Sequence, residues 1–338
     1  MWKKVGIGLG GCLVVISLLV GGYLYWNQQA LKKIKTSQHT VSKKIDTLKP
    51  CSFLLLGADT GAFGRVDRGN SDTMLVVTLN PQKQTTRITS IPRDALAEMV
   101  GDSTRNVQKI NAAYHIGGTK MAKQTVSQFL NVPIDYTGVI GMGALVKVVD
   151  FVGGVTLKTE QSFQLDQQTI KQGRQHLNGN QALAYARMRY EDPRGDYGRQ
   201  LRQQAILMAV AQKIIKPQYL LKLPQLIEAL GPDLKTDLTT HQIVALVKNY
   251  RSCQRHVVTT QLIGKTAWSN GSSYQIMPTA ILQKQSDQLR TSLGLAKTTL
   301  KNTATKLNLI NQPFFANQTQ ITYDTGDYRT VFYHDDTY

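Results

Sequence analysis

The amino-acid sequence predicts an α/β domain held behind a single N-terminal membrane anchor. Short, continuous apolar runs typical of buried strands begin at Cys51 and recur along the chain. Amphipathic segments with helical spacing alternate with these runs, and strands interleaved with helices are typical of layered α/β domains. An uncharged apolar stretch from Val5 to Trp26 precedes them. The 338 residues leave room for one large domain besides the anchor.

The apolar stretch 5–26 is long enough to cross a bilayer as a helix, since each residue adds about 1.5 Å. Aromatic residues gather at its C-terminal end, as they do at membrane surfaces. We therefore expect a cytoplasmic tail of residues 1–4, a single-pass span at 5–26 in the cell membrane, and an extracellular domain. A cleaved signal peptide and a lipoprotein signal ending at Cys12 are the alternatives, and the flanking lysines do not decide the orientation.

The charge balance predicts an anionic partner. The chain has 40 lysines and arginines against 22 acidic residues, a net charge of +18. Nucleic acid, a membrane surface and a phosphate-bearing polymer all fit such a charge. No helix-turn-helix or zinc module is recognisable, so we expect no nucleic acid. Cys51 and Cys253, which follow the anchor, are compatible with a disulfide or with two buried thiols.

The rest of the chain divides into a stalk, a domain and a tail. Residues 27–50 are polar and rich in lysine, which indicates a stalk, and residues 51–295 carry the strand and helix patterns of one domain. Strands are expected at 51–59, 72–80, 85–92, 155–159 and 256–263. Helices are expected at 119–130, 143–151, 219–230 and 240–250, with another running to Lys216. Residues 296–338 are polar with little periodicity, and we expect a flexible tail there.

The segment "ARMRYEDPRGDYGRQLRQ", residues 186–203, predicts a site for a multiply charged phosphate. Arg187 and Arg189 share one face if the segment is extended, at a strand end. Arg199 and Arg202 share one face of the helix that follows the turn. Arginine forks match phosphate oxygens, and a helix N-terminus adds free N–H groups. A solvated basic surface is the competing interpretation.

Two aspartates suggest a metal at the same place. Asp59 ends the first strand and Asp72 opens the second, so the two carboxylates meet at one sheet end if these strands are neighbours. Paired carboxylates completed by phosphate oxygens and water suit Mg²⁺, with Mn²⁺ as a substitute. Two turn aspartates that cap local N–H groups are the competing interpretation. Arg93 follows the third strand at the same sheet end. No P-loop, GxSxG or HExxH motif is present.

With these residues in place, the chain resembles the LytR-CpsA-Psr family of Gram-positive cell-wall enzymes. The resemblance covers about residues 51–295 and the arrangement of a short inner tail, one span and an outer domain. Seven segments occur in the family's order. They are "FLLLGADTG", "SDTMLVVTLNP", "SIPRD", "KINAAYHIGG", "VDFVGGV", "LNGNQALAYARMRYEDPRGDYGRQLRQ" and "GSSYQI".

The resemblance implies a three-layer α-β-α sandwich with a mixed sheet and an apolar cavity for a polyprenyl chain. It implies a Mg²⁺-dependent phosphotransferase that attaches a glycopolymer, such as teichoic acid or capsule, from a polyprenyl-pyrophosphate carrier to peptidoglycan. It also implies contact with membrane lipid. A polyprenyl-pyrophosphate phosphatase, a non-catalytic membrane-anchored regulator and a wall-polymer binder are the alternatives.

The resemblance also implies roles for individual residues. Asp59 and Asp72 match the family's metal-site aspartates, and with Arg93 and Arg187 they form the implied catalytic set. The implied pyrophosphate-binding set is Arg68, Arg93, Lys109, Arg187, Arg189, Arg199 and Arg202. One departure is Asn70, which stands where the family commonly has arginine. Arg68 and Arg65, in the same loop, are the candidates to compensate for it.

Overall fold

The computed structural model describes residues 42, 44–58, 69–214, 216–220, 222, 226, 229–230, 233–238, 242, 245–246, 249–317 and 319–331. The predicted anchor at 5–26 and the stalk residues 27–41 lie outside the described residues. Among the helices of the described part, none combines the length and the hydropathy needed to span a bilayer.

A mixed six-stranded sheet forms the centre of the molecule. Its strands are β1 Cys51–Ala58, β2 Ser71–Asn80, β3 Thr85–Ser90, β6 Tyr136–Gly141, β11 Leu234–Thr236 and β12 His256–Gln261. They lie in the order β11-β6-β1-β2-β3-β12. β1 is antiparallel to β2 and parallel to β6, and β12 is parallel to β3. The predicted strands 51–59, 72–80, 85–92 and 256–263 are therefore neighbours in one sheet.

Strand β1 is apolar apart from Ser52 because both of its faces are covered. Phe53 and Leu55 belong to one hydrophobic core, whereas Leu54 and Leu56 belong to another. Successive side chains of a strand point to opposite faces, so a continuous apolar run suits a strand between two helical layers. This arrangement confirms a layered α/β fold with a central mixed sheet.

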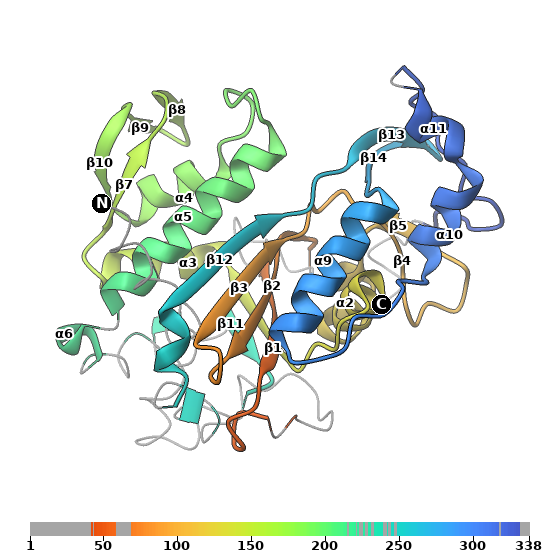
Figure 1. Ribbon diagram of the computed structural model, residues 1–338. Coiled ribbons are helices and arrows are strands. Elements are labelled where there is room, and N and C mark those ends of the chain that lie inside the picture. Colours follow the sequence, from red (N-terminus) through yellow and green to blue (C-terminus); the bar gives the residue numbers. More distant parts are fainter. Residues whose placement is uncertain are drawn as a thin grey trace.

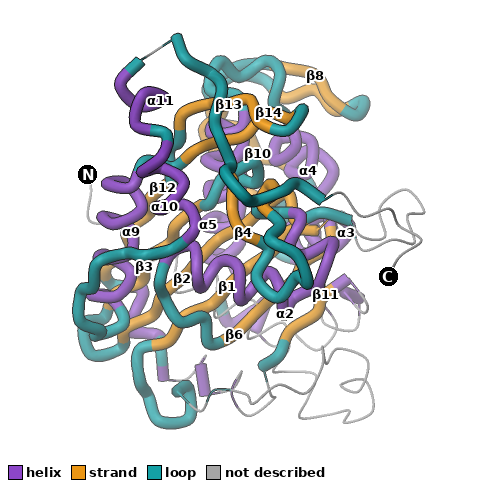
Figure 2. The backbone as a smooth tube through the Cα atoms, turned by 90° about the vertical axis from the view of Figure 1, so that its right-hand side faces the viewer, coloured by secondary structure: helices purple, strands orange, loops and turns teal. Residues whose placement is uncertain are grey.

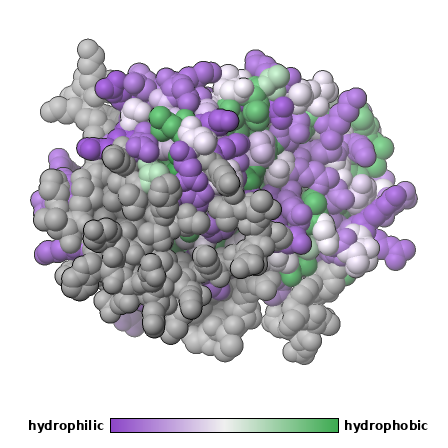
Figure 3. All heavy atoms as spheres, turned by 90° about the horizontal axis from the view of Figure 1, so that it is seen from below, coloured by the Kyte–Doolittle hydropathy of each residue, from purple (hydrophilic) through white to green (hydrophobic). Residues whose placement is uncertain are grey.

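Helices cover both faces of the sheet (Figure 1). One face packs against α3 Met142–Phe151, α4 Gly179–Arg187 and α5 Asp196–Ile214, and the other against α2 Ala112–Leu130 and α9 Thr279–Ser292. Helix α2 begins earlier than the predicted residue 119, and Gly117 and Gly118 interrupt it with non-helical backbone angles. In the described part of the face seen from below, most side chains are hydrophilic and hydrophobic ones are scattered (Figure 3).

Four short two-stranded sheets surround the central one. They pair β4 Leu96–Glu98 with β5 Val107–Lys109, β7 Val155–Thr159 with β10 Gly173–Leu177, β8 Phe163–Leu165 with β9 Gln168–Ile170, and β13 Lys265–Ser269 with β14 Ser272–Ile276. Two short helical elements are α6 Pro217–Leu220 and η5 Arg251–Gln254. Of these sheets, the sequence predicted only the strand 155–159. Strands of three to five residues are too short for a clear alternating pattern.

The described part of the C-terminal segment, residues 296–317 and 319–331, is folded against the domain, so the expectation of a flexible tail is wrong for this part of 296–338. It contains α10 Thr303–Ile310 and α11 Gln312–Ala316, which lie beside hairpin β13–β14 (Figure 2). Phe314 and Tyr323 form a third core with Ala267 and Tyr274 of that hairpin. The apolar residues of the segment are too widely spaced for a periodic pattern, but the fold brings them together.

We expect Phe314→Ala to lower the free energy of unfolding by about 3–5 kcal/mol, as for other buried phenylalanines. Phe314 is fully buried, in edge-to-face contact with Phe315 and Tyr323. Urea denaturation followed by circular dichroism measures the change. Leu309→Ala, at a side chain that is 71% exposed, is the matched control. Equal stability of the two variants would contradict a structural role for this segment.

The last residues of the predicted stalk pack on the domain. Ile45 is fully buried in the core beside α3 and α5, and its backbone N–H donates to Tyr136 Oη. The nearby Cys51 and Cys253 are both buried free thiols. Burial raises the pKa of both, to about 12 for Cys253. In the structure, Cys51 and Cys253 are therefore two buried thiols rather than a disulfide.

Candidate anion-binding site

The polar residues predicted at strand ends lie at one edge of the central sheet. Ala58, the last residue of β1, pairs with Ser71 of β2 and with Gly141 of β6. Asp72 therefore lies at this edge, and Arg93, which follows β3, lies beside it. Asp59, the residue after Ala58, lies outside the described residues, as do Arg65 and Arg68.

Asp72 and Asp196 connect two arginines that come from different parts of the chain. Arg93 Nη1 lies 2.8 Å from Asp72 Oδ1, and Arg199 Nη1 lies 3.9 Å from Asp72 Oδ2. Asp196, in the first turn of α5, lies 2.6 Å from Arg199 Nη2 and 3.7 Å from Arg93 Nε. These contacts hold the two guanidiniums side by side at the edge of the sheet.

Asp94 extends this cluster to Lys109. Asp94 lies 3.6 Å from Arg93 Nε and 2.9 Å from Lys109 Nζ, so Lys109 reaches the arginines through a carboxylate. The sequence reasoning placed Asp94 beside Arg93 at this sheet end but did not assign Asp196 to the site. The spacing of Asp196 and Arg199, three residues apart at a helix start, was a usable signal.

Burial and neighbouring charges shift the pKa values of the two arginines in different directions. Burial alone would lower the pKa of Arg93, but Asp72, Asp94 and Asp196 outweigh it and the pKa is raised. For Arg199, burial dominates and lowers the pKa, and the positive charges of Arg93 and Arg189 act in the same direction. The Arg199 side chain is only 8% exposed. Arginine keeps its proton at neutral pH even so, which leaves a poorly hydrated cation next to other cations.

A pocket of about 340 Å³ opens beside this cluster, between the sheet and helices α3, α4 and α5. Its polar lining consists of Asp72, Thr73, Arg93, Arg187, Arg189, Tyr190, Arg199 and Gln203. Its apolar lining includes Leu55, Leu75, Ile140, Val148, Ile206 and Val210. The pocket thus joins a charged part at the sheet edge to an apolar part between the layers.

The first arginine pair lies at a helix end, so the predicted strand end is wrong. Arg187 is the last residue of α4, and Met188 leaves the helix with ψ of 136°. Arg187 Nη1 lies 2.5 Å from Asp166 Oδ2. The guanidinium of Arg189 lies 5.7 Å from the ring centre of Tyr190, and no described carboxylate lies within ion-pairing distance of it. Arg187 and Arg189 both line the pocket nevertheless.

Arg202 has a different place from the one predicted for it. Its side chain is 4% exposed and bonds to Asp192, to Tyr185 O at 3.0 Å and to Met188 O. It is not among the residues that line the pocket. On helix α5, Arg199 therefore faces the pocket, whereas Arg202 faces the turn that contains Asp192. Arg202 thus anchors the loop that carries Arg189.

A glycine permits this close approach of turn and helix. A Cβ atom on Gly198 would overlap the carboxylate of Asp192. That carboxylate also accepts bonds from the backbone N–H and the guanidinium of Arg194. The arginine bonds, chiefly that from Arg194, hold the pKa of Asp192 at about 2 against the effect of burial. Asp192 is therefore an ionised anchor for the segment 188–202.

Comparisons with known proteins show the family of the chain. The LytR_cpsA_psr family model matches residues 21–291. A Bacillus cereus protein called polyisoprenyl-teichoic acid--peptidoglycan teichoic acid transferase TagU is 38% identical over 88% of this chain and 100% of its own length.

The chain belongs to the LytR-CpsA-Psr family.

Solved structures of similar proteins have the same fold. Protein gbs0355 from Streptococcus agalactiae is 34% identical, with a TM-score of 0.72 over 77% of this chain and 94% of its own. A structure of TagT bound to LIIa-WTA is 26% identical, with a TM-score of 0.61 over 73% of this chain and 92% of that one. The resemblance inferred from the seven segments is thereby confirmed.

In this LytR-CpsA-Psr protein, the described residues offer one carboxylate to a metal at the pocket. Asp72 is the acidic residue of the pocket lining, and no described donor hydrogen-bonds to its Oδ2 atom. Among the described residues, no group of three or more His, Cys, Asp or Glu is arranged to hold a metal. Mg²⁺ is commonly held by one or two carboxylates with phosphate oxygens and water. Asp72 fits such an ion.

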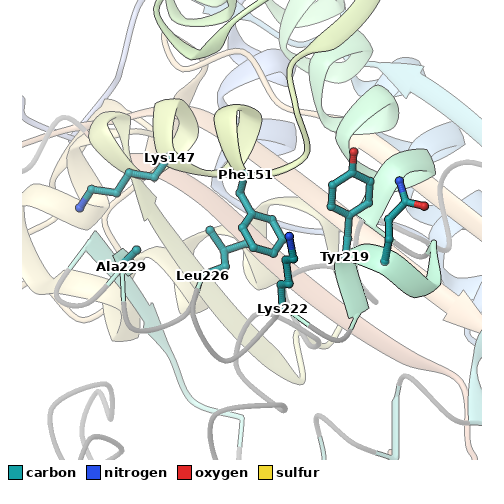
Figure 4. A pocket seen from close by; sticks show the side chains of 7 residues that line it. Lys147, Phe151, Tyr219, Lys222, Leu226 and Ala229 are labelled. Carbon is teal, nitrogen blue, oxygen red and sulfur yellow. The ribbon is translucent and has the colours of Figure 1, made fainter.

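A second pocket of about 520 Å³ lies at the C-terminal end of α3 (Figure 4). Phe151 and Tyr219 face it with ring centres 6.0 Å apart, and Lys147 and Lys222 flank it. Asp233 lies 3.0 Å from Lys147 Nζ and offsets its charge. No arginine or carboxylate is among its described lining residues. The predicted chemistry of this LytR-CpsA-Psr member therefore belongs to the first pocket.

Proposed function

We propose that the protein is a transferase that moves a glycopolymer, such as teichoic acid, from a polyprenyl-pyrophosphate carrier to peptidoglycan. The observation that carries this proposal is the division of the first pocket. Arginines gather where the pocket meets the sheet edge, and aliphatic side chains line the part between the sheet and the helices. An isoprenoid with a pyrophosphate head has this same division. The names of the relatives, teichoic acid transferases, support the same class of substrate.

The charged part of the pocket suits two linked phosphates. Arg93, Arg189 and Arg199 approach it from three segments of the chain, so each can bind a different oxygen. Arg93 Nε and Arg199 Nε are buried without a hydrogen-bond acceptor among the described residues. Such atoms are rare in folded proteins, and an anion between the guanidiniums would supply acceptors.

The proposed step needs no covalent enzyme intermediate. A hydroxyl oxygen of the acceptor sugar attacks the phosphorus next to the glycopolymer, and a new P–O bond forms. The bond from that phosphorus to the bridging oxygen breaks, and polyprenyl phosphate leaves with the electron pair. The hydroxyl proton passes to solvent. The arginines hold the phosphates in line and neutralise the charge that grows on the leaving group.

We assign Mg²⁺ to this site, with Asp72 and Asp59 as its protein ligands and Mn²⁺ as a substitute. When bound, the ion would screen the pyrophosphate and stabilise the leaving phosphate. Asp72 also positions Arg93, so its carboxylate serves both cations.

Because of these substrates, we also propose that the domain lies outside the cell, with residues 5–26 as a single-pass anchor and residues 1–4 in the cytoplasm. A lipid-linked donor requires contact with the membrane, which an anchor provides. Protease added to intact, wall-stripped cells tests this topology. Survival of the domain until the membrane is opened would exclude it.

Product analysis tests the reaction itself. The full-length protein in detergent is incubated with a lipid-pyrophosphoryl glycopolymer, Mg²⁺ and peptidoglycan strands, and the products are identified by mass spectrometry. A phosphodiester between polymer and glycan supports the transferase. A free polymer phosphate, formed equally well without glycan, would indicate a pyrophosphatase. Neither product despite donor binding would indicate a binder.

We expect Arg189→Ala to weaken binding of polyprenyl pyrophosphate by about tenfold to a hundredfold. Loss of one charge-assisted hydrogen bond costs about 1.5–3 kcal/mol. Arg189 has no described carboxylate partner, so its removal leaves no buried charge unpaired. Arg189→Lys should restore only part of the affinity, because lysine lacks the fork. Isothermal titration calorimetry measures the affinity, and a value equal to that of the parent would argue against a phosphate contact.

A further inference from the structure

We propose that the outer face of hairpin β13–β14 binds the acceptor glycan, with Trp268 as its stacking platform. This inference rests on the proposed function, since it concerns the second substrate of the same reaction. The hairpin rises beyond the edge of the central sheet that carries the arginines (Figure 1).

The two faces of the hairpin differ in composition. Ala267, Tyr274 and Ile276 are buried in the third core, against α10 and α11. Side chains alternate along a strand, so Trp268 on β13 and its partner Ser273 on β14 lie on the opposite face. Ser273 is exposed, and Trp268 is 53% exposed. A large aromatic ring thus lies on the outer face of a sheet whose inner face is packed.

The described neighbours of Trp268 on this face include several uncharged polar residues. Thr266 lies two residues before it, and Thr322 pairs with it in a parallel bridge. Both threonines are exposed. With Ser273 and Gln275 they supply hydroxyl and amide groups that both donate and accept hydrogen bonds. An exposed ring among such groups matches a neutral sugar, which has an apolar face and hydroxyls at its rim.

The backbone holds Trp268 in a fixed position. Its N–H donates to Ile321 O at 2.6 Å, and its carbonyl accepts from the N–H of Tyr323 at 3.2 Å. The segment 321–323 is therefore tied to the edge of the hairpin by a single β-bridge. An aromatic side chain on such a rigid support loses little conformational entropy when it binds a ligand.

A chain of hydrogen bonds joins this face to the arginine cluster. Gln275 Nε2 donates to Thr266 Oγ1 at 2.9 Å, and Tyr197 Oη donates to Gln275 Oε1 at 3.0 Å. The backbone N–H of Gln275 donates to Asp94 O at 2.8 Å. Tyr197 follows Asp196, which pairs with Arg199. A glycan lying over Trp268 and Thr266 would thus lead to the charged part of the pocket.

The outer face of the hairpin lies apart from the part of the pocket that would hold the lipid-linked donor. The apolar part of the pocket runs between the sheet and α3 and α5, so a lipid chain would occupy that layer. The hairpin packs next to α10 and α11, away from the layer formed by α3 and α5 (Figure 2). An acceptor on the hairpin could therefore present a hydroxyl to the phosphate without crossing the lipid.

Tryptophan fluorescence tests this proposal without any donor. Trp2 and Trp26 are the other tryptophans of the chain, so a Trp2→Phe/Trp26→Phe background leaves Trp268 as the reporter. Soluble peptidoglycan strands stripped of teichoic acid are titrated into this protein in detergent. We expect a saturable change in the Trp268 emission. Its absence at millimolar glycan would overturn the proposal, whether or not the protein transfers polymer.

Substitution of Trp268 is the second part of the experiment. We expect Trp268→Ala to weaken glycan binding at least tenfold by calorimetry and to raise the KM for the glycan similarly. The affinity for polyprenyl pyrophosphate should stay within twofold of the parent value. Trp268→Tyr, which keeps a flat ring, should bind glycan within threefold of the parent. Leu309→Ala, at another exposed apolar residue, is the matched control.

The outcomes separate the two proposals. Unchanged glycan affinity in Trp268→Ala would overturn the acceptor platform and leave the proposed transfer intact. Glycan binding that depends on Trp268 in a protein that forms no phosphodiester product would instead reject the proposed function. Should Trp268→Ala fail to fold, Trp268→Leu, which keeps bulk without a flat ring, gives the same comparison.

Discussion

Asp72→Asn is expected to lower the rate of the proposed transfer by at least about 10²–10³-fold, the usual cost of losing one charge-stabilising group in an active site. The substitution keeps the shape of the side chain and removes its charge. Asp72 contacts both Arg93 and Arg199 and is the described carboxylate that lines the pocket. Product formation measured across a Mg²⁺ titration gives the rate and its metal dependence.

Asp94→Asn is the matched control for this experiment. Asp94 also pairs with Arg93, but it does not line the pocket. If Asp72 acts only by positioning Arg93, the two variants should lose similar activity with the same Mg²⁺ dependence. If Asp72 binds the metal, Asp72→Asn alone should need far more Mg²⁺, while polyprenyl pyrophosphate still binds its arginines. Full activity of Asp72→Asn in EDTA would exclude the metal.

Arg202→Met is expected to lower the free energy of unfolding by about 3–5 kcal/mol, as for other buried ion pairs that lose one partner. The change leaves the Asp192 carboxylate, which is 2% exposed, with fewer donors, and leaves two backbone carbonyls unbonded. Urea denaturation measures it. Arg194→Met, which removes the half-exposed partner of the same carboxylate, should cost less because water can replace that guanidinium. Equal losses in the two variants would contradict this assignment.

The pH dependence of stability provides an independent check on Asp192. Its folded-state pKa, about 2, lies below the value of about 3.9 for an unfolded aspartate. The ionised form therefore stabilises the fold above about pH 4, and this contribution is lost as the pH falls toward 2. The stability difference between the parent and Asp192→Asn should shrink over that range. A difference that stays constant down to pH 2 would mean that the charge of Asp192 is not involved.

The layered core could be predicted from the sequence, because burial on both faces of a strand requires an uninterrupted apolar run. The run from Cys51 to Ala58 is such a strand, and the edge at which it ends could be inferred from its neighbours. Asp72 and Arg93 were therefore placed correctly beside each other. Arg187, Arg189 and Arg199 were likewise assigned to one site from their motif, and all three line the pocket.

Other features depended on contacts between residues far apart in the chain. Arg199 and Arg202 share a helix face by spacing. In the structure, however, Arg202 pairs with Asp192 in the turn, whereas Arg199 lines the pocket. The segment 296–331 looked unstructured because its few apolar residues have no period. Phe314 and Tyr323 are buried only because the hairpin β13–β14 lies opposite them.

The sequence by itself determined the family, the α/β class and the residue types of the candidate anion site, because motifs and strand periodicity are local. The tertiary structure decided which arginines line the pocket, which carboxylates hold them and where Trp268 lies. Apart from the local pairs Arg93–Asp94 and Asp196–Arg199, these features depend on packing between segments far apart in the chain, as in the bond between Arg199 and Asp72 O across the site. Spacing along the chain carries no information about such distances.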